Sequence, residues 1–299
     1  MKKLQLLGLM LAGTLGLNAQ LKTDSLKKYR CSGIIVESNA LYRGGPHYSL
    51  DRSDFQKFVT NQTLLNQDLT GYTNTGYSPR VYQYSKSFSI RAFVELGKGK
   101  RFRREGFIGA KIGRAEASRA FYYKESRDTT GIYTNTPNNA TTYSVTKINS
   151  SYSYAISALQ IFVPMGINLT TDKNKHFWFA AGIEVSPGIS CANEFTSRYI
   201  SQKKEVLLNS PNLVDNENFA AEQILDTKTT KETIKGIGFV GYASLPLAVN
   251  VRVSKKIKIL KNIDLNATLS PRAYYTNNRF VGSKTDLAFN TSFGLRYNW

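Results

Sequence analysis

Ionisable side chains recur at every second position in several segments of this chain. In "SFSIRAFVEL", Arg91 and Glu95 alternate with apolar residues, and Arg272 does the same in "NIDLNATLSPRAYY". Side chains two residues apart project from the same face of a β-strand. Acids and bases on such faces could form ion pairs or line a path for ions. The charges that we assign to this common polar face are Arg91, Glu95, Glu184, Asp264, Arg252, Arg272 and Arg296.

Residues for nucleophilic or metal chemistry are scarce. The chain has two cysteines, Cys31 and Cys191, and two histidines, His47 and His176, without close ligand spacing. A structural zinc site usually needs four such ligands. We therefore expect no enzymatic activity, no cofactor and no metal. A disulfide between the two cysteines stays open, because the sequence does not give the distance between their Cα atoms.

The elements that must position the charges are amphipathic strands. Apolar and polar residues alternate in "SFSIRAFVEL", "HFWFAAGIEVS", "FVGYASLPLAVNVRV", "NIDLNATLSPRAYY" and "DLAFNTSFGLRYNW". In the last segment Phe293, Leu295, Tyr297 and Trp299 share one face. A soluble edge strand rarely exposes such an apolar stripe. We predict that the stripe faces lipid.

Three further segments complete the strand set. "FIGAKIGRAEASRAFYY" and "YSYAISALQIFVPMGINL" alternate but change phase midway, which predicts a β-bulge in each, and "RCSGIIVESNALYR" is a weaker strand. The count is eight strands, or ten if 44–85 or 190–235 contains another hairpin. The predicted strands are 32–42, 86–97, 106–123, 143–167, 176–199, 233–253, 262–276 and 285–299.

The links between strands are of two alternating kinds. Short basic turns alternate with long polar loops at 44–85, 124–141 and 201–229. Two loop stretches look helical: 51–67, with Ser53 as its cap, and 215–225, with Asp215 as its cap. The pattern predicts an all-β, antiparallel, up-and-down transmembrane β-barrel with long polar outer loops and periplasmic termini. A soluble β-sandwich also has alternating strands, but it accounts less well for the links and the terminal stripe.

The N-terminus predicts export. Lys2 and Lys3 precede the apolar run "LQLLGLMLAGTLGL", and Ala19 precedes the expected cleavage point. We predict a signal peptide at 1–19 and a barrel at 20–299, in which 20–30 form a short lead. The expected location is the outer membrane of a Gram-negative bacterium.

The chain is strongly basic. Its net charge is +19, or +17 without Lys2 and Lys3. An exported chain meets lipid phosphates and anionic glycans rather than nucleic acid. The basic turns expected at the periplasmic rim contain Lys98, Lys100, Arg101, Arg103, Arg104, Lys255, Lys256 and Lys258, with Lys173 and Lys175 as a third group. Anionic lipid or an acidic protein would be their partner, although solubility alone also explains such turns.

Three motifs resemble a known family. "LQIFVPMGIN", a turn and "FWFAAGIEVSPGIS", and the closing "GLRYNW" resemble the PorT-like outer-membrane β-barrel family of Bacteroidota. Val163 stands where that family usually has isoleucine, and Trp299 where it usually has phenylalanine. The resemblance covers about 86–299 and implies the barrel fold. The likeness to outer-membrane barrels in general implies that the last strand is the signal read by the barrel assembly machinery.

The expected interior limits the function. Eight strands enclose a lumen just wide enough for side chains to fill it. We expect Glu95 and Glu184 to pair there with Arg252, Arg272 or Arg296, because an unpaired buried charge is costly. The prediction is a non-catalytic structural, binding or scaffolding protein that acts through its outer loops or basic turns. The alternatives are a small anion-preferring pore and an accessory component of a secretion apparatus.

Overall fold

The computed structural model describes residues 30–43, 51–74, 83–98, 102–135, 140–208, 223–257, 260–279 and 282–299. The expected signal peptide and residues 20–29 lie outside these ranges. No helix in the described ranges is long and apolar enough to cross a membrane.

Antiparallel strands make up most of the described chain. They are β1 (Arg30–Arg43), β2 (Thr73–Asn74), β3 (Gln83–Lys98), β4 (Arg103–Asn135), β5 (Ala140–Phe162), β6 (Met165–Thr170), β7 (Phe177–Leu208), β8 (Gln223–Ile234), β9 (Gly238–Ser244), β10 (Leu247–Arg252), β11 (Ile263–Asn278) and β12 (Gly282–Asn298). The helices are α2 (Arg52–Gln56) and a 3-10 turn at Leu260–Asn262.

Two of the barrel's strands are interrupted. β5 and β6 follow one another around Pro164, and both pair with β7. Similarly, β8, β9 and β10 run along the other edge of β7, with Pro246 between the last two. Proline has no N–H for the ladder, which explains the breaks at Pro164 and Pro246. The break between β8 and β9, at 235–237, contains no proline.

The strands close into a ring. β12 pairs with β11 on one side and with β1 on the other, so the last strand meets the first. When the interrupted strands are counted once, eight strands surround the interior, and the described residues contain no further hairpin of barrel length. The predicted antiparallel barrel and its strand number are confirmed, and the ten-strand alternative finds no support in the described ranges.

The barrel is apolar outside and polar inside. Along β12, Phe293 is 69% exposed whereas Arg296 is 2% exposed. β11 repeats the alternation over its whole length, with buried Asp264 beside exposed Leu265. A soluble protein buries the opposite set, so this polarity identifies a transmembrane β-barrel of the outer-membrane type. The exposed side chains form an apolar belt that includes Ile108, Ile112, Ile161, Ile167, Phe179, Ile183, Ile189, Leu247, Leu265, Phe289 and Phe293.

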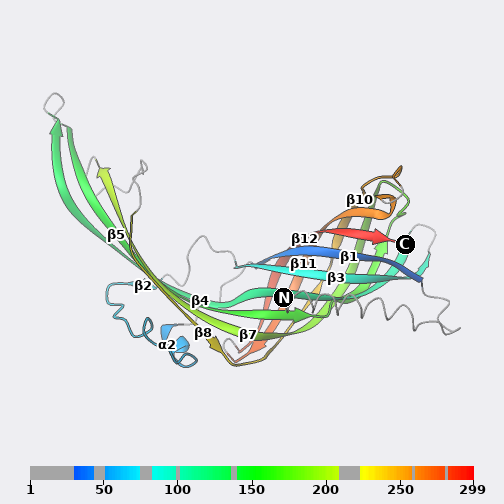
Figure 1. The fold of residues 1–299 in the computed structure, drawn as a ribbon, viewed down its shortest axis with the longest axis horizontal. Coiled ribbons are helices and arrows are strands. Elements are labelled where there is room, and N and C mark those ends of the chain that lie inside the picture. The colour runs from blue at the N-terminus through cyan, green and yellow to red at the C-terminus, as the bar shows by residue number, and fades with distance from the viewer. Residues whose placement is uncertain are drawn as a thin grey trace.

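Four strands continue well beyond the belt. Residues 116–135, 140–157, 193–208 and 223–234, called here the sheet extension, pair in the order β4, β5, β7, β8. Figure 1 shows β4, β5 and β7 leaving the ring as a long curved arm. The expected outer loops at 124–141 and 201–229 are therefore wrong over 124–135, 140–141, 201–208 and 223–229, which are strands. Both faces of these segments are largely polar, so the alternation that reveals a half-buried strand is missing.

The two predicted phase changes had different outcomes. The register of β4 against β5 shifts between Glu116 and Ser118, which confirms a bulge in this strand. No such slip occurs in β5, where Tyr154, Ile156 and Phe162 all face inward. The register shift at that level belongs to β7, where Ala192 has a left-handed φ of 49°.

The apolar inner face of β5 has a specific covering. The segment 51–74 packs against it and buries Phe55 and Leu65 beside Tyr154, whose hydroxyl donates to the carbonyl of Leu64 at 2.9 Å. In the extension, the apolar residues of β5 lie on the inner face, where the segment 51–74 shields them. In the belt, apolar residues of β5 lie on the outer face, where lipid contacts them.

The two helix predictions were only partly right. The helix expected at 51–67 spans Arg52–Gln56, and Asp51 rather than Ser53 is its N-cap. In the second predicted helix, 215–222 lie outside the described residues, and 223–225 belong to β8.

Candidate functional site: the charged interior of the barrel

The middle of the interior is organised around Arg91. From β3 its guanidinium donates to Glu37 on neighbouring β1 and, at 3.2 Å, to Glu184 on β7 across the lumen. Tyr242 donates its hydroxyl to the other Glu184 oxygen at 2.6 Å. Ser89 and Ser292 donate to Glu37. Both carboxylates thus have their hydrogen-bonding capacity largely used.

A second charge network lies nearer the C-terminus. Arg296 of β12 donates to both Glu105 oxygens of β4, at 3.0 and 2.8 Å, and Lys173 also donates to Glu105. The Arg296 guanidinium lies 4.0 Å from the centre of the Phe93 ring and 4.9 Å from that of Trp178. Aromatic faces add to the stabilisation of such a buried cation.

Asp264 of β11 forms hydrogen bonds with three other strands close to this network. It accepts hydrogen bonds from Arg252, from Trp178 Nε1 at 2.7 Å and from Asn298 at 2.7 Å. The three donors come from three different strands, so the carboxylate ties together β10, β7 and β12.

The expected pairings were wrong in detail. Glu184 pairs with Arg91, Arg252 with Asp264, and Arg296 with Glu105. Arg272 has no carboxylate within ion-pair distance among the described residues, and it lies over the Tyr242 ring instead. Glu95 lines the opening at the C-terminal end. Partners across a lumen depend on strand stagger, which the alternation of residue types does not reveal.

The interior leaves little open space. Two cavities in the middle of the barrel measure about 10 and 20 Å³, and both are lined by Arg91. A larger cavity of about 190 Å³ opens at the C-terminal end, between Arg30, Glu105 and Arg252. A space of about 10–15 Å³ holds one water molecule. The middle of the barrel is therefore filled by side chains.

The predicted basic turns gather at the C-terminal end. Arg103 and Arg104 begin β4, Lys98 ends β3, and Lys255 and Lys256 follow β10. Lys100, Arg101 and Lys258 lie outside the described residues. Lys173 lies in the turn between β6 and β7 at this end, but its ammonium is directed inward and buried against Glu105.

The predicted assembly residues form one outward stripe. Phe293, Leu295, Tyr297 and Trp299 are all exposed on the lipid side of the barrel. The rings of the last two lie 5.7 Å apart at 80°.

Several charged residues of the interior were not predicted from the sequence to lie there. They are Glu37, Glu105, Lys111 and Lys173, whereas Asp264 lies on the polar face as predicted. The alternation contains the signal for Lys111, which has the same parity as buried Phe107 of the same strand. Cys31 and Cys191 are free, and no group of three His, Cys, Asp or Glu suited to a metal occurs in the described part of the chain.

No family model and no curated protein matches the sequence. Solved structures that match at low similarity include the in-vitro folded OmpT, an outer membrane protein of Vibrio cholerae, which is 11% identical over 93% of this chain and 99% of that one, with a TM-score of 0.15. The outer membrane protein OpdK of Pseudomonas aeruginosa is 7% identical over 90% and 98%, with a TM-score of 0.15. OprB of Pseudomonas putida is 8% identical over 94% and 97%, with a TM-score of 0.13. The assignment as an outer-membrane-type barrel rests on the ring of strands and its polarity, and the PorT-like resemblance stays a prediction.

Proposed function

We propose that this chain is a non-catalytic outer-membrane protein that binds or scaffolds a partner through the sheet extension. The observation behind the proposal is the combination of a filled lumen with four strands that leave the membrane together. The parts of these strands beyond the belt contribute nothing to closing the barrel. Ordering so much chain is entropically costly, and a binding surface outside the membrane gives it a use.

The edges of the extension suit protein binding. Over 223–234, β8 pairs only with β7 among the described residues, and beyond Tyr123, β4 pairs only with β5. Unpaired strand edges offer a row of N–H and C=O groups to another chain. Addition of a partner strand is a common mode of peptide recognition. An accessory role in a secretion apparatus is one form of this proposal.

The best test removes the outer part of the sheet extension and keeps the barrel. Residues 124–150 and 202–225 are each replaced by an Asn-Gly turn, which joins positions that already pair across their hairpins. A photo-crosslinking amino acid is placed at exposed Thr229 in the full chain, at Thr196 in the full and shortened chains, and at Lys256 as the control at the opposite end. We expect discrete adducts at Thr229 and Thr196, loss of the Thr196 adduct on shortening, and unchanged folding. Adducts confined to Lys256 would contradict the proposal.

The alternative of a small anion-preferring pore has less support. Arg91, Glu184 and Tyr242 fill the middle of the lumen and bond to one another. We expect no single-channel steps from the purified barrel in planar bilayers. Regular anion-selective steps that survive removal of the sheet extension would favour the pore instead.

A further inference from the structure

Two cations in the barrel interior lack an anionic partner. Lys111 and Arg272 are each only 5% exposed. Neither forms a hydrogen bond or ion pair with the described residues, and Arg272 Nε is fully buried without a partner. By contrast, Arg91, Lys173, Arg252 and Arg296 each pair with a carboxylate.

The nearby carboxylates are already engaged. Glu37 and Glu184 are the acidic residues in this part of the interior, and both pair with Arg91. The middle of the barrel therefore holds three cations and two carboxylates. Tyr242 compensates in part, because its ring centre lies 4.0 Å from the Arg272 guanidinium and 5.4 Å from the Lys111 ammonium. A buried charge without a counter-charge is still costly.

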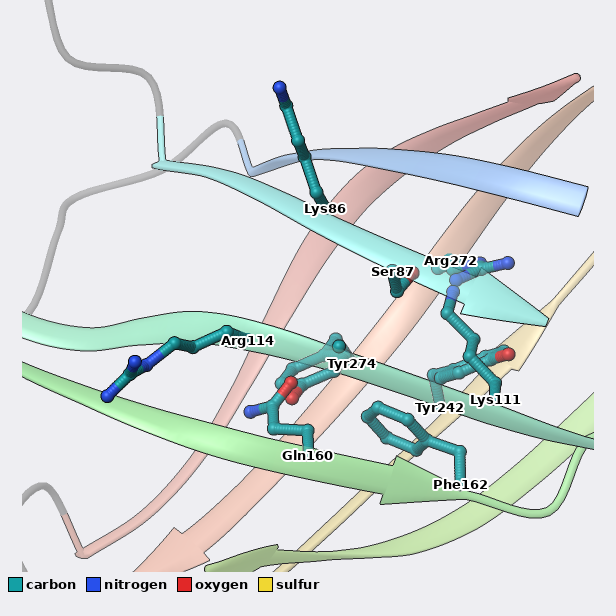
Figure 2. A pocket seen from close by; sticks show the side chains of 10 residues that line it. Lys86, Ser87, Lys111, Arg114, Gln160, Phe162, Tyr242, Arg272 and Tyr274 are labelled. Carbon is teal, nitrogen blue, oxygen red and sulfur yellow. The ribbon is translucent and has the colours of Figure 1, made fainter. Parts of the chain in front are cut away.

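Both cations line a small pocket that contains no acidic residue. Its walls also include Gln160, Phe162 and Tyr274. Figure 2 shows Lys111 and Arg272 together near Tyr242, with Gln160 and Tyr274 across from them, whereas Lys86 and Arg114 point away from the pocket. Arg114 instead pairs with Glu194 at 3.1 Å.

We propose that Lys111 and Arg272 form a binding site for one small monovalent anion, a halide such as chloride. The cavity measures about 10 Å³, which is the space for one particle of roughly water size. A halide would accept hydrogen bonds from the ammonium and from Arg272 Nε, and it would balance the excess positive charge. Phosphate and other tetrahedral oxyanions exceed this space.

The first test locates the anion. Crystals of the full barrel grown in sodium gluconate are soaked in sodium bromide, and bromide is located by its anomalous scattering. We expect a peak between Lys111 and Arg272 in the unaltered chain, no peak at this position in Lys111→Met, and a retained peak in Arg114→Met, whose side chain borders the same pocket. A peak-free pocket in the unaltered chain would overturn the proposal.

The second test measures the energetic effect. A ligand at ten times its Kd lowers the unfolded fraction by about tenfold. At a fixed denaturant concentration, we expect the unfolded-to-folded ratio of the unaltered chain and of Arg114→Met to be lower in bromide or chloride than in gluconate by about this factor. Lys111→Met and Arg272→Met should lose the halide dependence while remaining folded. Equal halide effects in all four proteins would show that the stabilisation arises elsewhere, and the proposal would then fail.

Discussion

Trp299 ends the lipid-facing stripe of β12, and its side chain is 54% exposed. Its backbone N–H donates to the carbonyl of Ser32 at 3.3 Å, so the last residue is held in register beside the first strand. Replacement of its side chain therefore removes an outward aromatic group without opening the interior.

Trp299→Gln should lower the amount of folded barrel in the outer membrane. The reason is that the stripe Phe293–Trp299 is the proposed assembly signal. The control is Phe179→Gln, because Phe179 is 55% exposed in the belt but lies far from the C-terminus. The measurement is heat-modifiable mobility on gels. Equal losses in both variants would point to lipid contact alone and contradict the signal role.

The Arg91 side chain carries the contact between β3 and β7 across the lumen. Arg91→Met would leave Glu37 and Glu184 buried without their cation. Breaking a buried ion pair in this way costs about 3–5 kcal/mol. We expect a loss of that order in the free energy of unfolding, measured by urea titration in detergent micelles. Arg198→Met, at an exposed position, should stay within about 0.5 kcal/mol of the unaltered chain.

At the scale of elements, the segment 51–74 is the cover of the sheet extension. Its apolar side chains pack on β4, β5 and β7, and Figure 1 places α2 beside the base of the arm. A polar clamp supplements this packing. The Glu232 carboxylate of β8 accepts the Thr60 hydroxyl at 2.6 Å, the Thr60 N–H at 3.0 Å and the Asn61 N–H at 2.8 Å.

The clamp should make docking of the segment dependent on pH. The hydrogen bond from the Thr60 side chain, together with the two N–H donors, holds the pKa of Glu232 below its ordinary value. A lowered folded-state pKa gives stability above the ordinary pKa, and this stability is lost as the pH falls through the lowered value. The pKa values of Asp54 and Asp68 are also lowered, but their partners Lys57 and Thr70 lie within the segment.

We therefore expect amide protection of 51–74, corrected for intrinsic exchange, to be higher at pH 7 than at about pH 3. Glu232→Gln should reduce this difference. Glu205→Gln is the matched control, because Glu205 is an exposed carboxylate of the extension that pairs with Lys203. An undiminished difference in Glu232→Gln would assign the pH response to other groups.

At the scale of the whole molecule, the two ends of the barrel differ. One end carries the sheet extension, and the other carries Trp299 and the basic residues that include Lys255 and Lys256. We propose that the basic end faces the periplasm. There its cations would attract anionic lipid heads or an acidic protein, at about 1 kcal/mol for each residue near the surface.

Cysteine labelling of intact cells tests this orientation. In a background with Cys31 and Cys191 replaced by serine, Thr229→Cys should react with an impermeant maleimide. Lys256→Cys should react only after the outer membrane is permeabilised. Labelling of Lys256→Cys on intact cells would mean that the topology is inverted.

Alternation within strands, together with the alternating short and long links, was enough to predict the ring of eight strands, its lipid-facing stripe and a polar interior. These are local properties, because successive side chains of a strand must point to opposite faces and a barrel leaves one face to lipid. Interior Lys111 could have been assigned by the same rule. The C-terminal pattern likewise predicts that Phe293 and Trp299 share the outer face, and both side chains are exposed there.

The partners of the interior charges were decided by the tertiary structure. Arg91 meets Glu184, and Arg296 meets Glu105, because strand stagger brings distant residues to the same level, and stagger leaves no periodic trace in the sequence. The outer parts of the sheet extension, 124–135, 140–141, 201–208 and 223–229, were mistaken for loops because both faces of these segments are largely polar. The inward apolar run of β5 depends on the cover formed by 51–74. Burial by a distant segment is a non-local property that strand periodicity does not report.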